Sequence, residues 1–178
     1  VQVSLTSFFN NKGIGSFPGQ ANFDGSGYSY PANELPSGGL ITVQGVVYLF
    51  PNNAPRTNDN VIASGQTIPL TPGNYRQAFL LVASSWGSVS SSITVRYTDG
   101  STTVSDVTVP DWYDGPLNGL SASYRYSPYG IDRHAVYIYV LSITLDSART
   151  ASALILPALP YGPYYMSRIH LFSLTLLH

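Results

Sequence analysis

Aromatic side chains in loop-like segments are the residues of this sequence best suited to bind a ligand. The chain has 14 Tyr, 7 Phe and 2 Trp, and several fall among Gly, Ser, Asn and Pro, where loops are expected. An aromatic ring can cover the apolar face of a sugar while a carboxylate, amide or guanidinium binds its hydroxyl groups. The alternative for each ring is that it caps an open end of the core. The candidate ligand-binding residues are Asp24, Tyr28, Tyr30, Trp86, Trp112, Tyr113, Arg125 and Tyr126, and Tyr129 is a further loop aromatic.

Asp24 begins a short acidic turn, Asp24-Gly25-Ser26-Gly27, that suits either a ligand or a local structural role. Its carboxylate can accept sugar hydroxyls, or it can bind Ca²⁺ together with Asn22 and backbone carbonyls. The structural alternative is an Asx-turn, in which the carboxylate accepts hydrogen bonds from its own backbone. The spacing of acids typical of a calcium loop is missing. A second oxygen-rich loop, Arg56–Asn60, is an equal candidate for a structural Ca²⁺, and no other cofactor is expected.

Catalytic residues are harder to assemble from this sequence. Asp111 and Asp114 flank Trp112 and are the one candidate carboxylate pair of the kind that glycosidases use. We favour the alternative, a turn with solvated acids. The chain has three His and none of the motifs of serine hydrolases, zinc peptidases or phosphate-binding loops. The sequence therefore favours a non-catalytic protein.

The composition limits the class of partner. Only 10% of the 178 residues are charged, the net charge is -1, and the eight Lys and Arg are scattered, so nucleic acid is a poor partner. A surface of Ser, Thr, Asn, Gly and Tyr suits an extracellular protein that recognises neutral ligands. No apolar run is long enough to span a membrane. The chain has no Cys. It opens directly into a strand-like pattern, as expected of a mature protein or an excised module.

Short runs of Val, Ile, Tyr and Thr between Pro and Gly predict strands and no regular helix, apart from one helical turn near Ala32–Leu35. Two of the runs, at 135–145 and 169–177, are apolar at nearly every position, as in strands buried on both faces. The pattern predicts one all-β domain, residues 1–178, an antiparallel two-sheet β-sandwich of jelly-roll type. The predicted strands are Val1–Ser7, Ile41–Leu49, Thr67–Leu70, Tyr75–Ser84, Ser91–Thr98, Thr102–Val109, Ala135–Leu145, Ala151–Leu156 and Ile169–Leu177.

Asp99-Gly100 is the clearest turn signal, because this dipeptide favours a two-residue type I′ hairpin. Such a turn pairs Tyr97 with Thr102 and Val95 with Val104. The alternation of apolar residues then shifts by one, so a β-bulge is expected near Ser105-Asp106.

The segment 21–39 is predicted to be a long connection across one end of the sandwich. Phe23 is expected to enter the core. Tyr28 and Tyr30 should share one direction if that piece of chain is extended.

A set of short sequence blocks resembles an accessory domain found on secreted bacterial and fungal glycoside hydrolases. The blocks are FFNNKGIG, FDGSGYSYPANELP, ASGQTIPL, VRYTDGST, VPDWY and a closing LP…RIHLFSLTL. They occur in the same order over nearly the whole chain. The resemblance implies a non-catalytic β-sandwich similar to galactose-binding-like and carbohydrate-binding modules. Trp86, in SSWGS, stands where a small polar residue is expected in that group.

Together these observations predict a lectin-like accessory module of a secreted carbohydrate-active protein, which binds a neutral glycan or polysaccharide and is covalently linked to a catalytic domain. Its loop aromatics would hold the sugar. The alternative is a structural module that packs against a glycoside hydrolase without binding sugar. A glycan-active enzyme is the third hypothesis.

Overall fold

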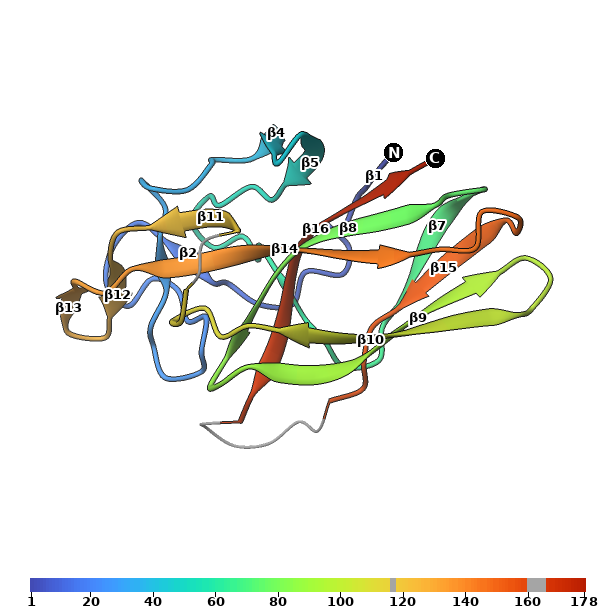
Figure 1. The fold of residues 1–178 in the computed structure, drawn as a ribbon. Coiled ribbons are helices and arrows are strands. Elements are labelled where there is room, and N and C mark those ends of the chain that lie inside the picture. Colours follow the sequence, from blue (N-terminus) through green and yellow to red (C-terminus); the bar gives the residue numbers. More distant parts are fainter. Residues whose placement is uncertain (116–117, 160–165) are drawn as a thin grey trace.

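The computed structural model describes residues 1–115, 118–159 and 166–178, and these residues form strands, turns and loops without a helix. The predicted all-β class is therefore confirmed. No described segment forms a helix long and apolar enough to cross a membrane. Figure 1 shows two main sheets, with a further layer of loops and small hairpins at one side.

The larger sheet has the strand order β1-β16-β8-β14-β11, and β6 also pairs with β16. Every pairing in this sheet is antiparallel. Its strands are β1 (Gln2–Val3), β6 (Val61–Ile62), β8 (Gln77–Ser85), β11 (Gly119–Ala122), β14 (Val136–Thr144) and β16 (Arg168–Leu177).

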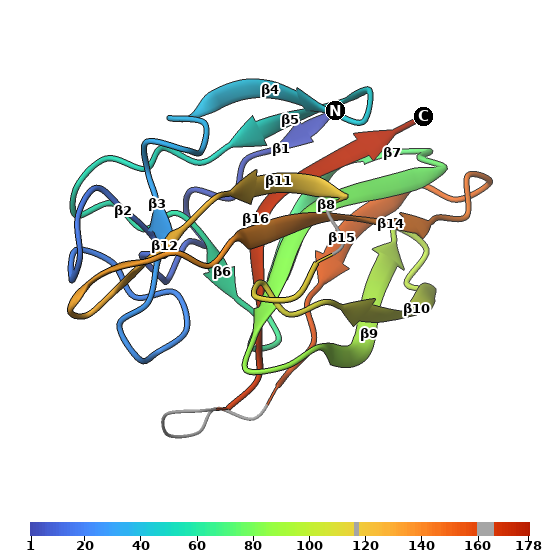
Figure 2. The ribbon, with the colours of Figure 1, turned by 60° about the vertical axis from the view of Figure 1, so that its left-hand side comes forward.

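The smaller sheet has the order β10-β9-β15-β7 and faces the larger one (Figure 2). A hydrophobic core fills the space between them, with Leu80 and Leu171 from the larger sheet and Ile93 and Leu154 from the smaller. This packing makes the two-sheet sandwich predicted from the sequence. The strands are β7 (Thr67–Gly73), β9 (Val89–Tyr97), β10 (Thr102–Val109) and β15 (Ala151–Ile155).

A second core covers the outer face of the larger sheet. Alternate side chains of one strand enter the two cores, so that Leu80 belongs to the first core and Leu81 to the second. Phe23 and Tyr48 reach the second core from the N-terminal part of the chain. The larger sheet is thus buried on both faces, and eight successive residues of β16, 169–176, are buried. The covering layer includes β2 (Ile14–Gly15), β3 (Tyr30–Pro31), β4 (Gly39–Val43) and β5 (Val46–Phe50).

Two predicted strands differ from the structure. The expected strand Ile41–Leu49 is a hairpin, in which β4 and β5 join through Gln44 and Gly45 at φ values of 50° and 76°. Two successive residues with positive φ make a type I′ turn, which reverses the chain inside one apolar run. The expected strand Val1–Ser7 is paired only at Gln2–Val3. Near Ala32–Leu35 the chain forms one hydrogen-bonded turn, in which the Glu34 N–H donates to the Pro31 carbonyl at 3.2 Å.

The β9–β10 hairpin has a different register from the predicted one. Val95 pairs with Thr103, and the Tyr97 N–H donates to the Ser101 carbonyl at 2.9 Å, so the loop has three residues. Gly100 has a φ of 84°, as expected for a loop that ends in a left-handed residue. The apolar alternation then continues without the expected bulge, and Val104 is 61% exposed. The other predicted strands agree with the structure to within three residues at each end.

Candidate functional site

Four segments that are distant in sequence converge on one hollow of about 340 Å³, which we call the aromatic pocket. The loop before β3 contributes Asp24 and Tyr28, and the turn between β8 and β9 contributes Trp86. The segment after β10 contributes Asp111, Trp112, Tyr113 and Asp114, and a β-bridge between Asp111 and Ser84 holds it beside β8. Strand β12 (Arg125–Ser127) contributes Arg125. The hollow is large enough for a small ligand. Its lining residues are Asp24, Tyr28, Trp86, Gly87, Asp111, Trp112, Tyr113, Asp114 and Arg125.

Six of the eight candidate residues identified in the sequence line this pocket, and two do not. Tyr30 is wholly buried, and its hydroxyl donates to the Tyr137 carbonyl at 2.7 Å. Tyr126 is 8% exposed, and its hydroxyl donates to the Ser16 carbonyl at 3.2 Å. Phe23 enters the core as expected, but Tyr28 and Tyr30 have different surroundings. Tyr28 borders the open pocket, whereas Tyr30 packs edge-on against Phe23 beneath it.

Arg125 lies at the centre of a stack of flat groups. Its guanidinium carbon is 4.1 Å from the centre of the Tyr28 ring and 4.6 Å from that of Tyr113. Tyr113 also stacks on His134, with 3.4 Å between ring centres. Arg125 Nε donates to Asp132 at 2.7 Å. Asp132 lies on β13 (Gly130–Asp132), which pairs with β12. The cation–π contacts and the ion pair hold the guanidinium in one orientation.

Trp86 occupies an unusual backbone position. Its φ is 60°, in the left-handed region that a bulky residue seldom adopts, and Gly87 follows at 102°. Polar contacts hold this turn: the Trp86 indole N–H donates to the Asp24 carbonyl at 2.6 Å, and the Gly87 N–H donates to the Asp111 carboxylate. The side chain is 37% exposed. Backbone strain of this kind is concentrated at functional sites.

The acidic residues of the pocket differ in how many hydrogen bonds their carboxylates already accept within the protein. The Asp24 carboxylate accepts hydrogen bonds from the N–H groups of Ser26 and Tyr28 at 2.8 and 3.2 Å. It therefore forms the Asx-turn that the sequence analysis gave as the structural alternative. Burial raises the pKa of the Asp24 carboxyl, and these hydrogen bonds and the Arg125 charge partly offset the rise. Asp111 accepts the Tyr113 N–H at 2.9 Å as well as that of Gly87. Among the described residues, none hydrogen-bonds to the exposed carboxylate of Asp114.

Asp59, in the second oxygen-rich loop, is buried and paired inside the protein. It bonds Lys12 Nζ at 2.9 Å and accepts the Gly13 N–H at 2.8 Å. Burial raises the pKa of the Asp59 carboxyl, and the Lys12 charge opposes this. In the part of the chain that the structure describes, no three His, Asp or Glu side chains gather in a way that could hold a metal ion.

His170 lies in a buried polar network next to Phe23. Its Nδ1 is 2.8 Å from the Asn60 side-chain oxygen, and its ring centre is 3.9 Å from that of Phe23. Its Nε2 faces the Ser85 hydroxyl at 3.4 Å. Burial, with a smaller contribution from the Arg168 charge, lowers the pKa of His170 to about 3. The imidazole is therefore neutral at physiological pH.

A family model described as the AziU2-like beta-sandwich domain matches residues 1–177. The chain belongs to this family. The match agrees with the sandwich seen in the structure and covers the strands that carry every wall of the aromatic pocket. A comparison of this AziU2-like domain with curated proteins finds no match.

Gly87 is a lining residue of the AziU2-like domain that the sequence analysis did not single out, and its position next to Trp86 was the available signal. Asp111 and Asp114 also line the pocket, although the sequence suggested them only as a candidate carboxylate pair and not as ligand-binding residues. Asp132 and His134 support the pocket from outside it. No signal in the sequence pointed to Asp132 as the partner of Arg125, because that pairing depends on the β12–β13 register.

Proposed function

We propose that this domain is a non-catalytic carbohydrate-binding accessory module of a secreted protein and that it holds a neutral glycan in the aromatic pocket. One observation supports the proposal most. Six residues chosen from the sequence for their fit to sugar chemistry come from four separate segments and line the same hollow.

In the proposed mode, Trp86 provides the apolar contact, and Arg125 and Asp114 bind hydroxyl groups. The Arg125 guanidinium uses Nε for Asp132, and among the described residues no partner takes its terminal nitrogens. A sugar hydroxyl both donates and accepts, so a fixed donor and an open acceptor together suit it. Tyr28 and Tyr113 face the guanidinium. Their role in this mode is therefore to position Arg125.

The resemblance to accessory domains of glycoside hydrolases supports a covalently linked catalytic domain as the partner. A single shallow sugar site is weak. Linked to an enzyme, it raises the effective concentration of that enzyme at its polymer. The proposed mode needs no cofactor.

Affinity electrophoresis on a panel of neutral polysaccharides tests the proposal. We expect at least one polysaccharide to retard the domain and Trp86→Ala to abolish most of the retardation. Tyr129→Ala is the matched control, because Tyr129 is an aromatic residue, 98% exposed, that does not line the pocket. If no glycan retards the domain, or if both variants behave alike, the proposal fails.

Exposed apolar side chains, one of them in the pocket, favour one alternative, a structural module that packs on a catalytic domain. Tyr113, Tyr129 and Ile131 are 38%, 98% and 61% exposed. Burial of such groups suits a protein interface as well as a sugar site. This alternative gains if no polysaccharide retards the domain while Ile131→Asp weakens its association with a linked enzyme.

A catalytic role is tested separately by assaying glycan hydrolysis. Turnover that Asp111→Asn or Asp114→Asn abolishes would replace the non-catalytic proposal.

A further inference from the structure

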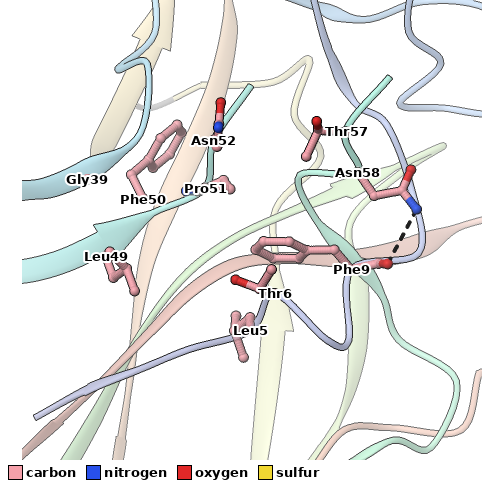
Figure 3. A pocket seen from close by; sticks show the side chains of 10 residues that line it. All are labelled: Leu5, Thr6, Phe9, Gly39, Leu49, Phe50, Pro51, Asn52, Thr57 and Asn58. Atoms are coloured by element: carbon pink, nitrogen blue, oxygen red, sulfur yellow. Dashed lines mark hydrogen bonds between the residues drawn. The ribbon is translucent and has the colours of Figure 1, made fainter. Parts of the chain in front are cut away.

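A second hollow, of about 220 Å³, lies between the N-terminal segment and the end of the β4–β5 hairpin (Figure 3), and we call it the neutral pocket. It shares no described lining residue with the aromatic pocket. An inference about it therefore does not depend on the proposed function. Its lining residues are Leu5, Thr6, Phe9, Gly39, Leu49, Phe50, Pro51, Asn52, Thr57 and Asn58.

The lower part of the neutral pocket is apolar. The Phe9 ring lies across it next to Leu5, as Figure 3 shows, and Phe50 and Pro51 form the wall opposite. Leu5 and Phe50 are 3% and 1% exposed, so both are anchored in the cores beneath. This part of the pocket is thus a firm apolar surface with room above it.

Among the described residues that line this pocket, none carries a charge. A charged ligand would lose its hydration here without gaining a partner, which is costly. An uncharged ligand with an apolar body avoids that cost and gains from burial.

The polar groups lie at the rim and leave donors available. The Asn52 side-chain oxygen accepts the Ala54 N–H at 2.9 Å, and Asn58 Nδ2 donates to the Phe9 carbonyl at 3.3 Å. Among the described residues, none hydrogen-bonds to the Asn52 amide nitrogen or to the Thr57 hydroxyl. In Figure 3 both side chains lie on the side of the pocket away from Phe9. A ligand needs only one polar end to meet them.

The apolar surface continues out of the pocket along the hairpin. Leu49 is 36% exposed, and its cross-strand partner Leu40 is 68% exposed. Side chains directly opposite on paired strands lie close enough to form one surface. A chain seated on Phe9 can therefore extend over Leu49 toward Leu40.

We propose that the neutral pocket is a second ligand site, specific for an uncharged small molecule with an aliphatic chain and one terminal hydrogen-bonding group. The chain lies on Phe9 and along Leu49, and the polar end meets Asn52 and Thr57. Neither the family match nor the proposed sugar site assigns a ligand to this part of the fold.

A homologous series of straight-chain alcohols, from butanol to decanol, tests the proposal by NMR titration of the whole domain. Each added methylene should tighten binding by about threefold to fourfold until the pocket is full, as expected for burial of one methylene group. The largest backbone amide shifts should be those of Thr6, Phe9 and Thr57. Binding that does not depend on chain length, or shifts that are scattered over the surface, would overturn the proposal.

Thr57→Trp fills the mouth of the pocket from an exposed position, where the fold tolerates a larger side chain. We expect it to weaken decanol binding more than tenfold. Thr108→Trp, on the exposed face of β10, is the matched control and should bind decanol as the unmodified domain does. Thermal unfolding of both variants confirms that they are folded. Equal binding by the two folded variants would mean that the alcohols bind outside the neutral pocket, and the proposal would fail. The apolar surface there would then suit contact with an apolar side chain of another protein.

Discussion

Polar contacts hold the walls of the aromatic pocket in place, whereas the walls of the neutral pocket are held mainly by apolar packing. Arg125 is fixed by two rings and by Asp132, and the Trp86 turn depends on hydrogen bonds to Asp24 and Asp111. Phe9 lies against Leu5 and the first core. The difference teaches that a charge-poor protein can still concentrate its few charges at one site. Three of its nine acidic residues line the aromatic pocket.

The largest effect should come from the ring beneath the aromatic pocket. Phe23 is wholly buried and contacts Tyr30, Trp112 and His170. Phe23→Ala should lower the free energy of unfolding by about 3–5 kcal/mol, as other buried Phe to Ala changes do. Phe9→Ala should cost on the order of 1–2 kcal/mol, because that ring is only partly buried. Urea unfolding measures both losses in the free energy of unfolding. Equal losses would contradict the difference between the ring beneath the aromatic pocket and the ring in the neutral pocket.

Lowering the pH should destabilise the protein through His170, in the buried network beside Phe23. The neutral pocket should not contribute, since it has no titratable side chain among its described residues. The pKa of His170 is about 3 in the folded protein against an ordinary value of 6.5. Between these values the unfolded chain binds the proton and the folded protein does not, so stability falls as pH falls. From pH 6.5 to pH 4.5 we expect a loss of roughly 2–3 kcal/mol from this group.

Asp24 and Asp59 have raised pKa values and work in the opposite direction, because each gains relative stability as it is protonated. Comparison of the unmodified domain with His170→Gln isolates the histidine contribution. The variant should show a shallower loss of stability between pH 6.5 and pH 4.5. Identical pH profiles would contradict the assignment.

Loss of the fixed guanidinium should impair only the aromatic pocket. Arg125→Gln should weaken glycan binding about 10- to 100-fold, in line with the loss of a charge-assisted hydrogen bond. Decanol binding at the neutral pocket should not change. Arg149→Gln is the matched control, since Arg149 also pairs with an acid, Asp146 at 3.3 Å, and lies over a ring, that of Tyr97 at 5.7 Å. Isothermal titration calorimetry with each ligand measures both effects.

The smallest effect concerns the backbone of the Trp86 turn. Trp86→Gly and Trp86→Ala both remove the ring, but only glycine adopts a φ of 60° without a penalty. The glycine variant should therefore be more stable than the alanine variant by about 1 kcal/mol, the cost of a left-handed residue. Thermal unfolding at neutral pH measures the difference. An alanine variant of equal stability would show that the turn relaxes.

The strand pattern could be predicted because it depends on local alternation. Burial of β16 on both faces followed from its largely apolar sequence, and Phe23 was correctly predicted to enter the core. The hairpin at Gln44-Gly45 was missed because apolar residues on both sides of the turn look like one strand. The register at Asp99-Gly100 was wrong by one residue, because the same dipeptide also suits a three-residue loop.

The candidate site was predictable in its residue types but not in its arrangement. Trp86 and Arg125 could be chosen as sugar-binding types, and their meeting in one pocket depends on contacts far apart in sequence. Tyr30 and Tyr28 are two residues apart and have similar sequence surroundings. The Tyr137 carbonyl, which accepts the Tyr30 hydroxyl, lies more than a hundred residues away, and no local pattern reveals it.

Burial of the larger sheet on both faces has a consequence for the order in which the chain can fold. The covering layer comes from residues 14–50, yet Phe172, on which it packs, belongs to the last strand, Arg168–Leu177. During synthesis, that layer must wait until β16 has left the ribosome. Contacts this distant in sequence slow folding, and unprotected apolar segments meanwhile are prone to aggregate. Synthesis that stops before β16 should therefore leave an insoluble chain rather than a smaller sandwich.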